Sequence, residues 1–110
     1  MDVNFSKQGD WTIIAVEGRM DTVSAPEFEK MVQERILQGS NRLIVDFSKL
    51  DYISSAGLRS ILVAGKNSKA KGGELACCGL QGVVKKVFDV SGFHKLLPIF
   101  DSKEDVLNRE

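Results

Sequence analysis

The chain has 110 residues, of which 43% are hydrophobic and 27% charged, a composition typical of one ordinary globular domain. Fifteen lysine and arginine residues balance fifteen aspartate and glutamate residues, which argues against nucleic-acid binding and against anchoring by a polybasic patch. No apolar run approaches the roughly 18 residues that a membrane-spanning helix needs, and the first residues lack the features of a signal peptide. We therefore expect a single cytoplasmic domain over residues 1–110 that neither binds nucleic acid nor inserts into a membrane.

The first 20 residues predict a β-hairpin. The β-branched, apolar run Trp11–Val16 predicts a strand that closes at Glu17-Gly18. The weaker alternation in Val3–Ser6 predicts its partner, with the turn at Gly9-Asp10.

A helix is predicted to follow the hairpin. Ser24 predicts its N-cap, because Pro26 falls in the first turn and Glu27 stands three residues on, as in a capping box. Apolar residues then recur at helical spacing from residue 25 to residue 36, and Gly39 predicts the end of the helix.

The middle of the chain predicts a buried strand and a second helix. Leu43–Phe47 is apolar except at Asp46, which predicts a strand that is covered on both faces and therefore central in its sheet. After a short link, residues 57–71 carry apolar and small residues at helical spacing, and Gly72-Gly73 predicts the stop.

The C-terminal third continues the alternation of strands and helices. Glu74–Cys78 predicts a fourth strand, and Val83–Phe88 predicts one face of a helix that stops at Ser91-Gly92. Leu96–Phe100 predicts a last strand, which we place at the edge of the sheet because Pro98 cannot donate a hydrogen bond to a neighbouring strand. A short helix starting at residue 101 or 102 completes the chain. Strands that alternate with helices predict a mostly parallel sheet.

Two adjacent serines carry the most informative chemistry. Ser54 and Ser55 stand where a buried strand passes into a helix, the place at which open α/β sheets form sites. One interpretation is a helix N-cap, worth about 1 kcal/mol. A nucleophilic serine is disfavoured, because the first glycine of a G-x-S-x-G turn is missing and His94 is the only histidine. The third interpretation is a regulated phosphoserine, whose charge would suit a helix N-terminus.

Metal and cofactor sites are poorly supported. Asp21, Asp46 and Asp51 could meet at the carboxyl end of the sheet and bind Mg²⁺, although turn and cap roles are commoner for such residues. The glycine pairs match neither a Walker A loop nor a dinucleotide-binding loop. Cys77 and Cys78 are adjacent and cannot form a zinc site, so we read them as buried apolar residues. We expect no cofactor, no metal and no enzymatic activity.

Five segments in the right order carry a family resemblance over nearly the whole chain: Val16–Asp21, Leu43–Leu50, Tyr52–Leu58, Gly72–Leu75 and Val87–Phe93. Together they resemble the STAS-domain family, specifically the bacterial anti-anti-sigma factors, also called anti-sigma factor antagonists. Tyr52–Leu58 is similar to the family signature [YF]-[IM]-D-S-[STA]-G-L. The resemblance implies the STAS fold, an α/β fold with a mixed four- to five-stranded β-sheet and about four α-helices chiefly on one face.

The resemblance also implies a partner switch. The unphosphorylated protein would bind an anti-sigma factor, which is a serine kinase of the histidine-kinase-like ATPase class, and so free a sigma factor for transcription. Phosphorylation by that kinase would separate the two proteins, and a phosphatase of the PP2C type would reset the switch. The chain would then be a substrate and a ligand rather than a catalyst.

Transfer by position gives the site residues. The family's phosphorylated serine falls on Ser55, and Ser54, which stands where the family usually has aspartate, is the alternative acceptor. Asp21 comes from the resemblance and Arg59 from helix geometry, one turn beyond Ser55. We expect one exposed surface around the start of the second helix to contain Gly18, Asp21, Ser54, Ser55 and Arg59. Ala56 and Gly57 complete the predicted partner-binding residues.

Other functions of the same family stay open from the sequence. The chain could be a cytoplasmic STAS subunit of a lipid or solute transporter, or a STAS module that senses a small molecule. It could also be an interaction domain in which Ser55 is never modified.

Overall fold

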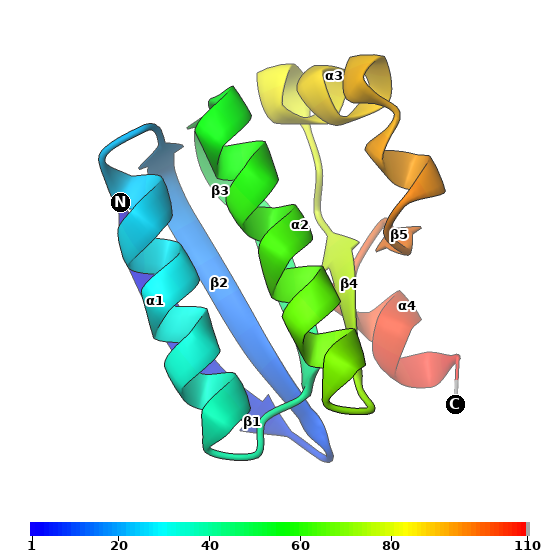
Figure 1. The fold of residues 1–110 in the computed structure, drawn as a ribbon. Coiled ribbons are helices and arrows are strands. Elements are labelled where there is room, and N and C mark those ends of the chain that lie inside the picture. The colour runs from blue at the N-terminus through cyan, green and yellow to red at the C-terminus, as the bar shows by residue number, and fades with distance from the viewer. Residues whose placement is uncertain (110) are drawn as a thin grey trace.

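The computed structural model describes residues 1–109, which form five strands, four α-helices and one 3₁₀ turn (Figure 1). Their bounds in chain order are β1 Asp2–Gln8, β2 Trp11–Met20, α1 Ser24–Leu37, β3 Arg42–Ile53, α2 Ser55–Ala70, β4 Glu74–Cys78, α3 Gly82–Ser91, the 3₁₀ turn Phe93–Lys95, β5 Ile99–Phe100 and α4 Lys103–Asn108.

The strands form one mixed sheet in the order β1-β2-β3-β4-β5. β1 pairs with β2 in antiparallel fashion, and every other neighbouring pair is parallel. β3 is the central strand, and its side chains Leu43, Val45 and Phe47 are fully buried. The predicted mixed α/β architecture and the central position of this strand are therefore confirmed.

Helices cover both faces of the sheet, but unequally. The core on one face joins α1, α2 and α3 to the sheet through residues such as Phe28, Ile61 and Phe88. The smaller core on the other face contains Val106 of α4. The helices thus lie chiefly on one face, as the resemblance implied. Cys77 and Cys78 lie in β4 and belong to opposite cores, each as a buried free thiol.

Helices α1 and α2 run side by side over the sheet (Figure 1). Near their starts, the Ser60 hydroxyl of α2 donates a hydrogen bond of 3.1 Å to the Ala25 carbonyl of α1. Near their ends, the Asn67 amide donates a hydrogen bond of 2.8 Å to the Gln33 side-chain oxygen. These two contacts hold the helices together at both ends, so their N-termini meet at the carboxyl ends of the parallel strands.

Two strands are longer than their sequence patterns predict. β2 does not close at Glu17-Gly18 but continues to Met20, because Gly18 takes a positive φ of 97° and forms an irregularity within the strand. β3 continues past Phe47 to Ile53, so the predicted link between this strand and the following helix is mostly β-strand. The polar residues after Phe47 look like a loop in the sequence, yet they pair with the extension of β2.

Two local predictions are wrong at element ends. Ser24 is not an N-cap; it lies in the first turn of α1, and the Asp21 carboxylate accepts hydrogen bonds from the backbone there instead. The last strand covers only Ile99–Phe100, because Leu96 and Leu97 donate to the Phe93 carbonyl and stay in a helical turn. The short strand β5 does lie at the sheet edge, as predicted.

Thr12 provides a test of the packing. Its side chain is buried in β2, and its hydroxyl has no hydrogen-bond partner within residues 1–109. Because an unpaired buried hydroxyl is costly and valine has nearly the same shape, we expect Thr12→Val to raise the free energy of unfolding by about 1 kcal/mol. Urea denaturation measures this change. Ser60→Ala is the control and should lower stability, because it removes a hydroxyl that has a partner. A Thr12→Val protein no more stable than the wild type would contradict the expectation.

Candidate functional site

The loops that leave β2 and β3 at their carboxyl ends meet beside the starts of α1 and α2. The Ser54 backbone N–H donates a hydrogen bond of 2.8 Å to the Met20 carbonyl, which ties the start of α2 to the end of β2. The loop after β2 carries Asp21, and the turn after β3 carries Ser54 and Ser55. The fold therefore brings the two segments that carry most of the predicted site residues to the same end of the sheet.

The two serines have different environments. Ser54 is the N-cap of α2, and its hydroxyl oxygen accepts a hydrogen bond of 3.1 Å from the Gly57 backbone N–H. Ser54 is half-buried, whereas Ser55 is the first residue of the helix and is exposed. The cap interpretation thus holds for Ser54, and the hydroxyl of Ser55 is not used for capping.

Gly57 lies in the first turn of α2 and is buried. A β-carbon at this position would lie 2.7 Å from the Ile53 side chain and 2.9 Å from that of Met20, closer than real β-carbons come to other atoms. The absence of a side chain therefore lets the start of α2 approach the sheet. Of the predicted partner-binding residues, this one is beneath the surface and acts through packing.

Asp21 organises the loop between β2 and α1. One oxygen of its carboxylate accepts backbone hydrogen bonds of 3.0 Å from Val23 and from Ser24. The Ser24 hydroxyl lies 3.1 Å from the same oxygen and accepts a hydrogen bond of 2.9 Å from the Asp21 backbone N–H. The backbone and side-chain hydrogen bonds from Ser24 lower the pKa of Asp21, so its carboxylate is negatively charged at neutral pH.

Arg19 was not predicted as a site residue, although it lies next to Gly18 at this end of β2. Its guanidinium stacks over the ring of Tyr52 at 4.2 Å from the ring centre. The two residues pair across β2 and β3. This contact depends on the register between the two extended strands, so no local signal in the sequence could have identified it.

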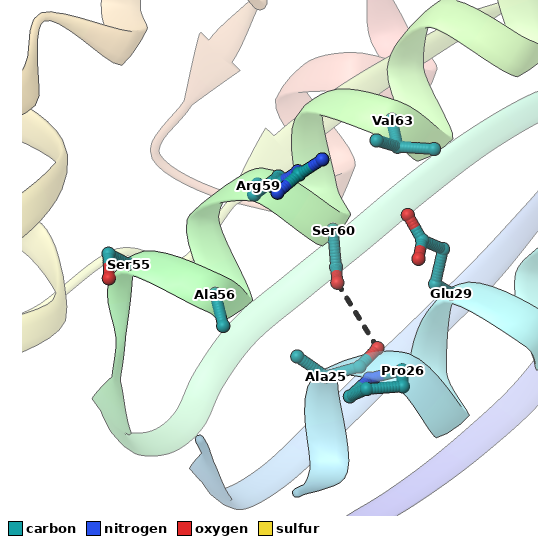
Figure 2. A pocket seen from close by; sticks show the side chains of 8 residues that line it. All are labelled: Ala25, Pro26, Glu29, Ser55, Ala56, Arg59, Ser60 and Val63. Carbon is teal, nitrogen blue, oxygen red and sulfur yellow. Dashed lines mark hydrogen bonds between the residues drawn. The ribbon is translucent and has the colours of Figure 1, made fainter. Parts of the chain in front are cut away.

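Two hollows flank the start of α1, and the predicted residues divide between them. The first, of about 520 Å³, lies between α1 and α2, and Figure 2 shows Ser55, Ala56 and Arg59 on one side of it and Ala25, Pro26 and Glu29 on the other. The second hollow, of about 460 Å³, is lined by Gly18, Arg19, Asp21, Val23, Ser24, Glu27 and Met1. The hollow beside Ser55 therefore has a wall from α1 that the sequence did not suggest.

The site contains no cluster suited to metal-assisted chemistry. Within residues 1–109, no group of three histidine, cysteine, aspartate or glutamate side chains is arranged to hold a metal ion. No helix in the same part of the chain is long and apolar enough to cross a membrane. The site instead combines an exposed hydroxyl, three acidic and two basic side chains and two shallow hollows, which suits contact with another protein.

Known proteins are similar to this chain over nearly its whole length. The family model of the STAS domain matches residues 2–106. BtrV of Bordetella bronchiseptica, named as an anti-sigma factor antagonist, is 34% identical over 104 residues, which cover 94% of this chain and 90% of BtrV.

Solved structures of other proteins have the same fold as this chain at lower sequence identity. A protein of Thermotoga maritima that is also named as an anti-sigma factor antagonist superimposes with a TM-score of 0.91 at 19% identity, over 97% of this chain and 92% of that one. The Bacillus cell fate determinant SpoIIAA in its phosphorylated form gives a TM-score of 0.74 at 19% identity, over 98% of both chains. These likenesses confirm the fold that the resemblance implied.

The different roles of the two serines predict different effects on stability. Ser54→Ala removes the cap of α2 and should lower the free energy of unfolding by about 1 kcal/mol. Ser55→Ala leaves the cap intact. It should change the free energy of unfolding by less than about 0.5 kcal/mol, as substitutions at exposed positions usually do. Chemical denaturation of the two variants beside the wild type measures both effects. Equal losses from the two substitutions would mean that both hydroxyls support the helix.

Proposed function

Because the chain belongs to the STAS-domain family, we propose that it is an anti-sigma factor antagonist whose binding is controlled by phosphorylation of Ser55. The proposed partner is an anti-sigma factor that is also a serine kinase of the histidine-kinase-like ATPase class. Binding of the unphosphorylated chain frees a sigma factor, and a PP2C-type phosphatase restores that form after phosphorylation. The chain acts in the cytoplasm as a single domain over residues 1–110 and is not itself the enzyme.

The observation that carries the proposal is the exposed hydroxyl of Ser55 on the first turn of α2. A kinase must reach this oxygen from solution, and the groove beside it gives access from the α1 side. Ser54, the alternative acceptor, is half-buried and its oxygen already accepts the Gly57 N–H. Phosphorylation of Ser54 would require the cap of α2 to open, which favours Ser55.

The proposed reaction is a phosphoryl transfer within the complex. The Ser55 oxygen forms a bond to the γ-phosphorus of ATP, and the bond from that phosphorus to the oxygen bridging to the β-phosphate breaks. ADP leaves, and the hydroxyl proton passes to a base of the kinase. Nothing in this step requires a catalytic group from the chain itself, in keeping with a role as substrate.

The added phosphate explains release in physical terms. It brings a charge of about −1.5 to −2 to a surface that fits closely against the partner. Like charges or desolvated charges in an interface cost several kcal/mol. A loss of about 4 kcal/mol weakens binding roughly a thousandfold, which is enough to separate two proteins at cellular concentrations.

The remaining predicted residues surround the acceptor in this proposal. Asp21 and Arg59 supply opposite charges in the two hollows, and Ala56 supplies a small side chain beside Ser55. Gly18 also borders the second hollow. Gly57 supports the surface from below, since its own position is buried.

Phosphate mapping tests the proposal. The kinase is the one that is recovered from the native cell with the Ser55→Ala protein. Incubated with this kinase and Mg-ATP, the wild-type chain should gain one phosphate on Ser55, located by mass spectrometry. Ser55→Ala should bind the kinase as tightly as the wild type but should not be released by ATP, and Ser55→Asp should bind more weakly. Phosphate on Ser54 alone would move the acceptor by one residue, and phosphate on neither serine would overturn the proposed switch.

Removal of a single charge tests the partner-binding surface. Asp21→Asn keeps an oxygen that can accept the backbone hydrogen bonds of its loop, but it removes the negative charge. We expect it to weaken kinase binding about tenfold or more, as the loss of a charged partner in an interface does. Glu34→Gln is the control, because it removes one acidic charge from an exposed position near the other end of α1. Equal affinities of the two variants, measured by titration calorimetry, would remove Asp21 from the interface.

A further inference from the structure

Arg59 is a basic side chain that lies beside the proposed phosphate acceptor. It lies on α2, four residues after Ser55, and both side chains are exposed and line the same hollow (Figure 2). In the described part of the chain its guanidinium takes part in no ion pair and no hydrogen bond. The charge is therefore available to whatever acquires a negative charge nearby.

The spacing suits an interaction between these two residues. Side chains four positions apart lie on the same face of a helix, with their β-carbons about 5–6 Å from each other. A guanidinium offers several N–H donors in a planar fork that fits two oxygens of a phosphate. The order along the helix, with the acidic group N-terminal to the basic one, is the more favourable of the two.

We propose that Arg59 binds the phosphate on Ser55 within the same chain, so that phosphorylation also withdraws this arginine from the partner. The inference rests on the proposed function, because it concerns the phosphorylated form of Ser55. It adds a second effect to the switch. The phosphate repels the partner or does not fit against it. In addition, the phosphate pairs with the guanidinium of Arg59, which the unphosphorylated surface offers to the partner.

One acidic group opposes this interaction. Glu29 on α1 lines the opposite wall of the same hollow and is half-buried. It forms no ion pair with Arg59 within residues 1–109, so the arginine does not have to leave a partner before it binds phosphate. Since Glu29 is present in every protein compared below, its repulsion of the phosphate cancels from the comparison.

The test uses full-length chain that carries phosphoserine at position 55, installed during synthesis by an expanded genetic code. The ³¹P NMR signal of the phosphate is followed against pH to obtain its second pKa, which is about 6 for an ordinary phosphoserine. At physiological ionic strength we expect this pKa to be about 0.5 unit lower in the wild type than in Arg59→Gln, because the guanidinium favours the dianion. Arg59→Lys should restore part of the difference.

Lys66→Gln is the matched control. Lys66 is another exposed basic residue of α2, but it lies eleven residues from Ser55, about 16 Å along the helix and beyond the Debye length at physiological salt. Its substitution should leave the phosphate pKa unchanged. Equal phosphate pKa values in the wild type and in Arg59→Gln would overturn the inference, as would an equal shift in Lys66→Gln.

The experiment separates this inference from the proposed function. The phosphate is present without any kinase, so the NMR result does not depend on whether a kinase recognises Ser55. A shifted pKa together with failure of the phosphate mapping would refute the switch and leave the Arg59 contact. Successful mapping with an unshifted pKa would refute the Arg59 contact and leave the switch.

Discussion

The close approach of α2 to the end of β2 determines where the proposed site lies. A β-carbon on Gly57 would overlap the side chains of Ile53 and Met20, so any other residue at this position would have to displace them. The hydrogen bond from the Ser54 N–H to the Met20 carbonyl fixes the same contact through the backbone. These two contacts therefore hold the first turn of α2 against the end of β2, and the exposed Ser55 lies on that turn.

The sequence predicted correctly those helices and strands that are defined by the spacing of their own apolar residues and by the glycines beside them. Helix α3 and strand β4 match their predictions closely, because apolar spacing and the flanking glycines define them within a few residues. The extension of β3 was missed because its polar residues become a strand only by pairing with the end of β2, far away in the sequence. The false N-cap at Ser24 has a similar origin, since serine, proline and glutamate fit a capping box while the carboxylate of Asp21 actually takes that place.

The residues of the candidate site were likewise predictable only where local sequence features, rather than contacts between distant segments, place them. Arg59 followed from helical spacing alone, and Ser55 and Asp21 followed from motifs that resemble those of a known family. Glu29 and Pro26 could not be predicted, because they reach the site only through the packing of α1 against α2. The division of the site into two hollows is likewise a property of tertiary structure, since the start of α1 lies between them.

The distribution of charge shows why one phosphate could control such a surface. The chain has a formal net charge of zero, so no general electrostatic field favours or opposes a partner, and recognition depends on local groups. Around the acceptor those groups are mixed, with the negative Asp21 in one hollow and the positive Arg59 in the other. A partner complementary to this surface must present both positive and negative groups in the right places.

Under the proposed function, phosphorylation adds negative charge on the side of Arg59 and neutralises the arginine as well. The hollow beside Ser55 then gains a negative charge and loses its available positive one, and the partner group that had faced Arg59 meets a like charge without any change in the fold.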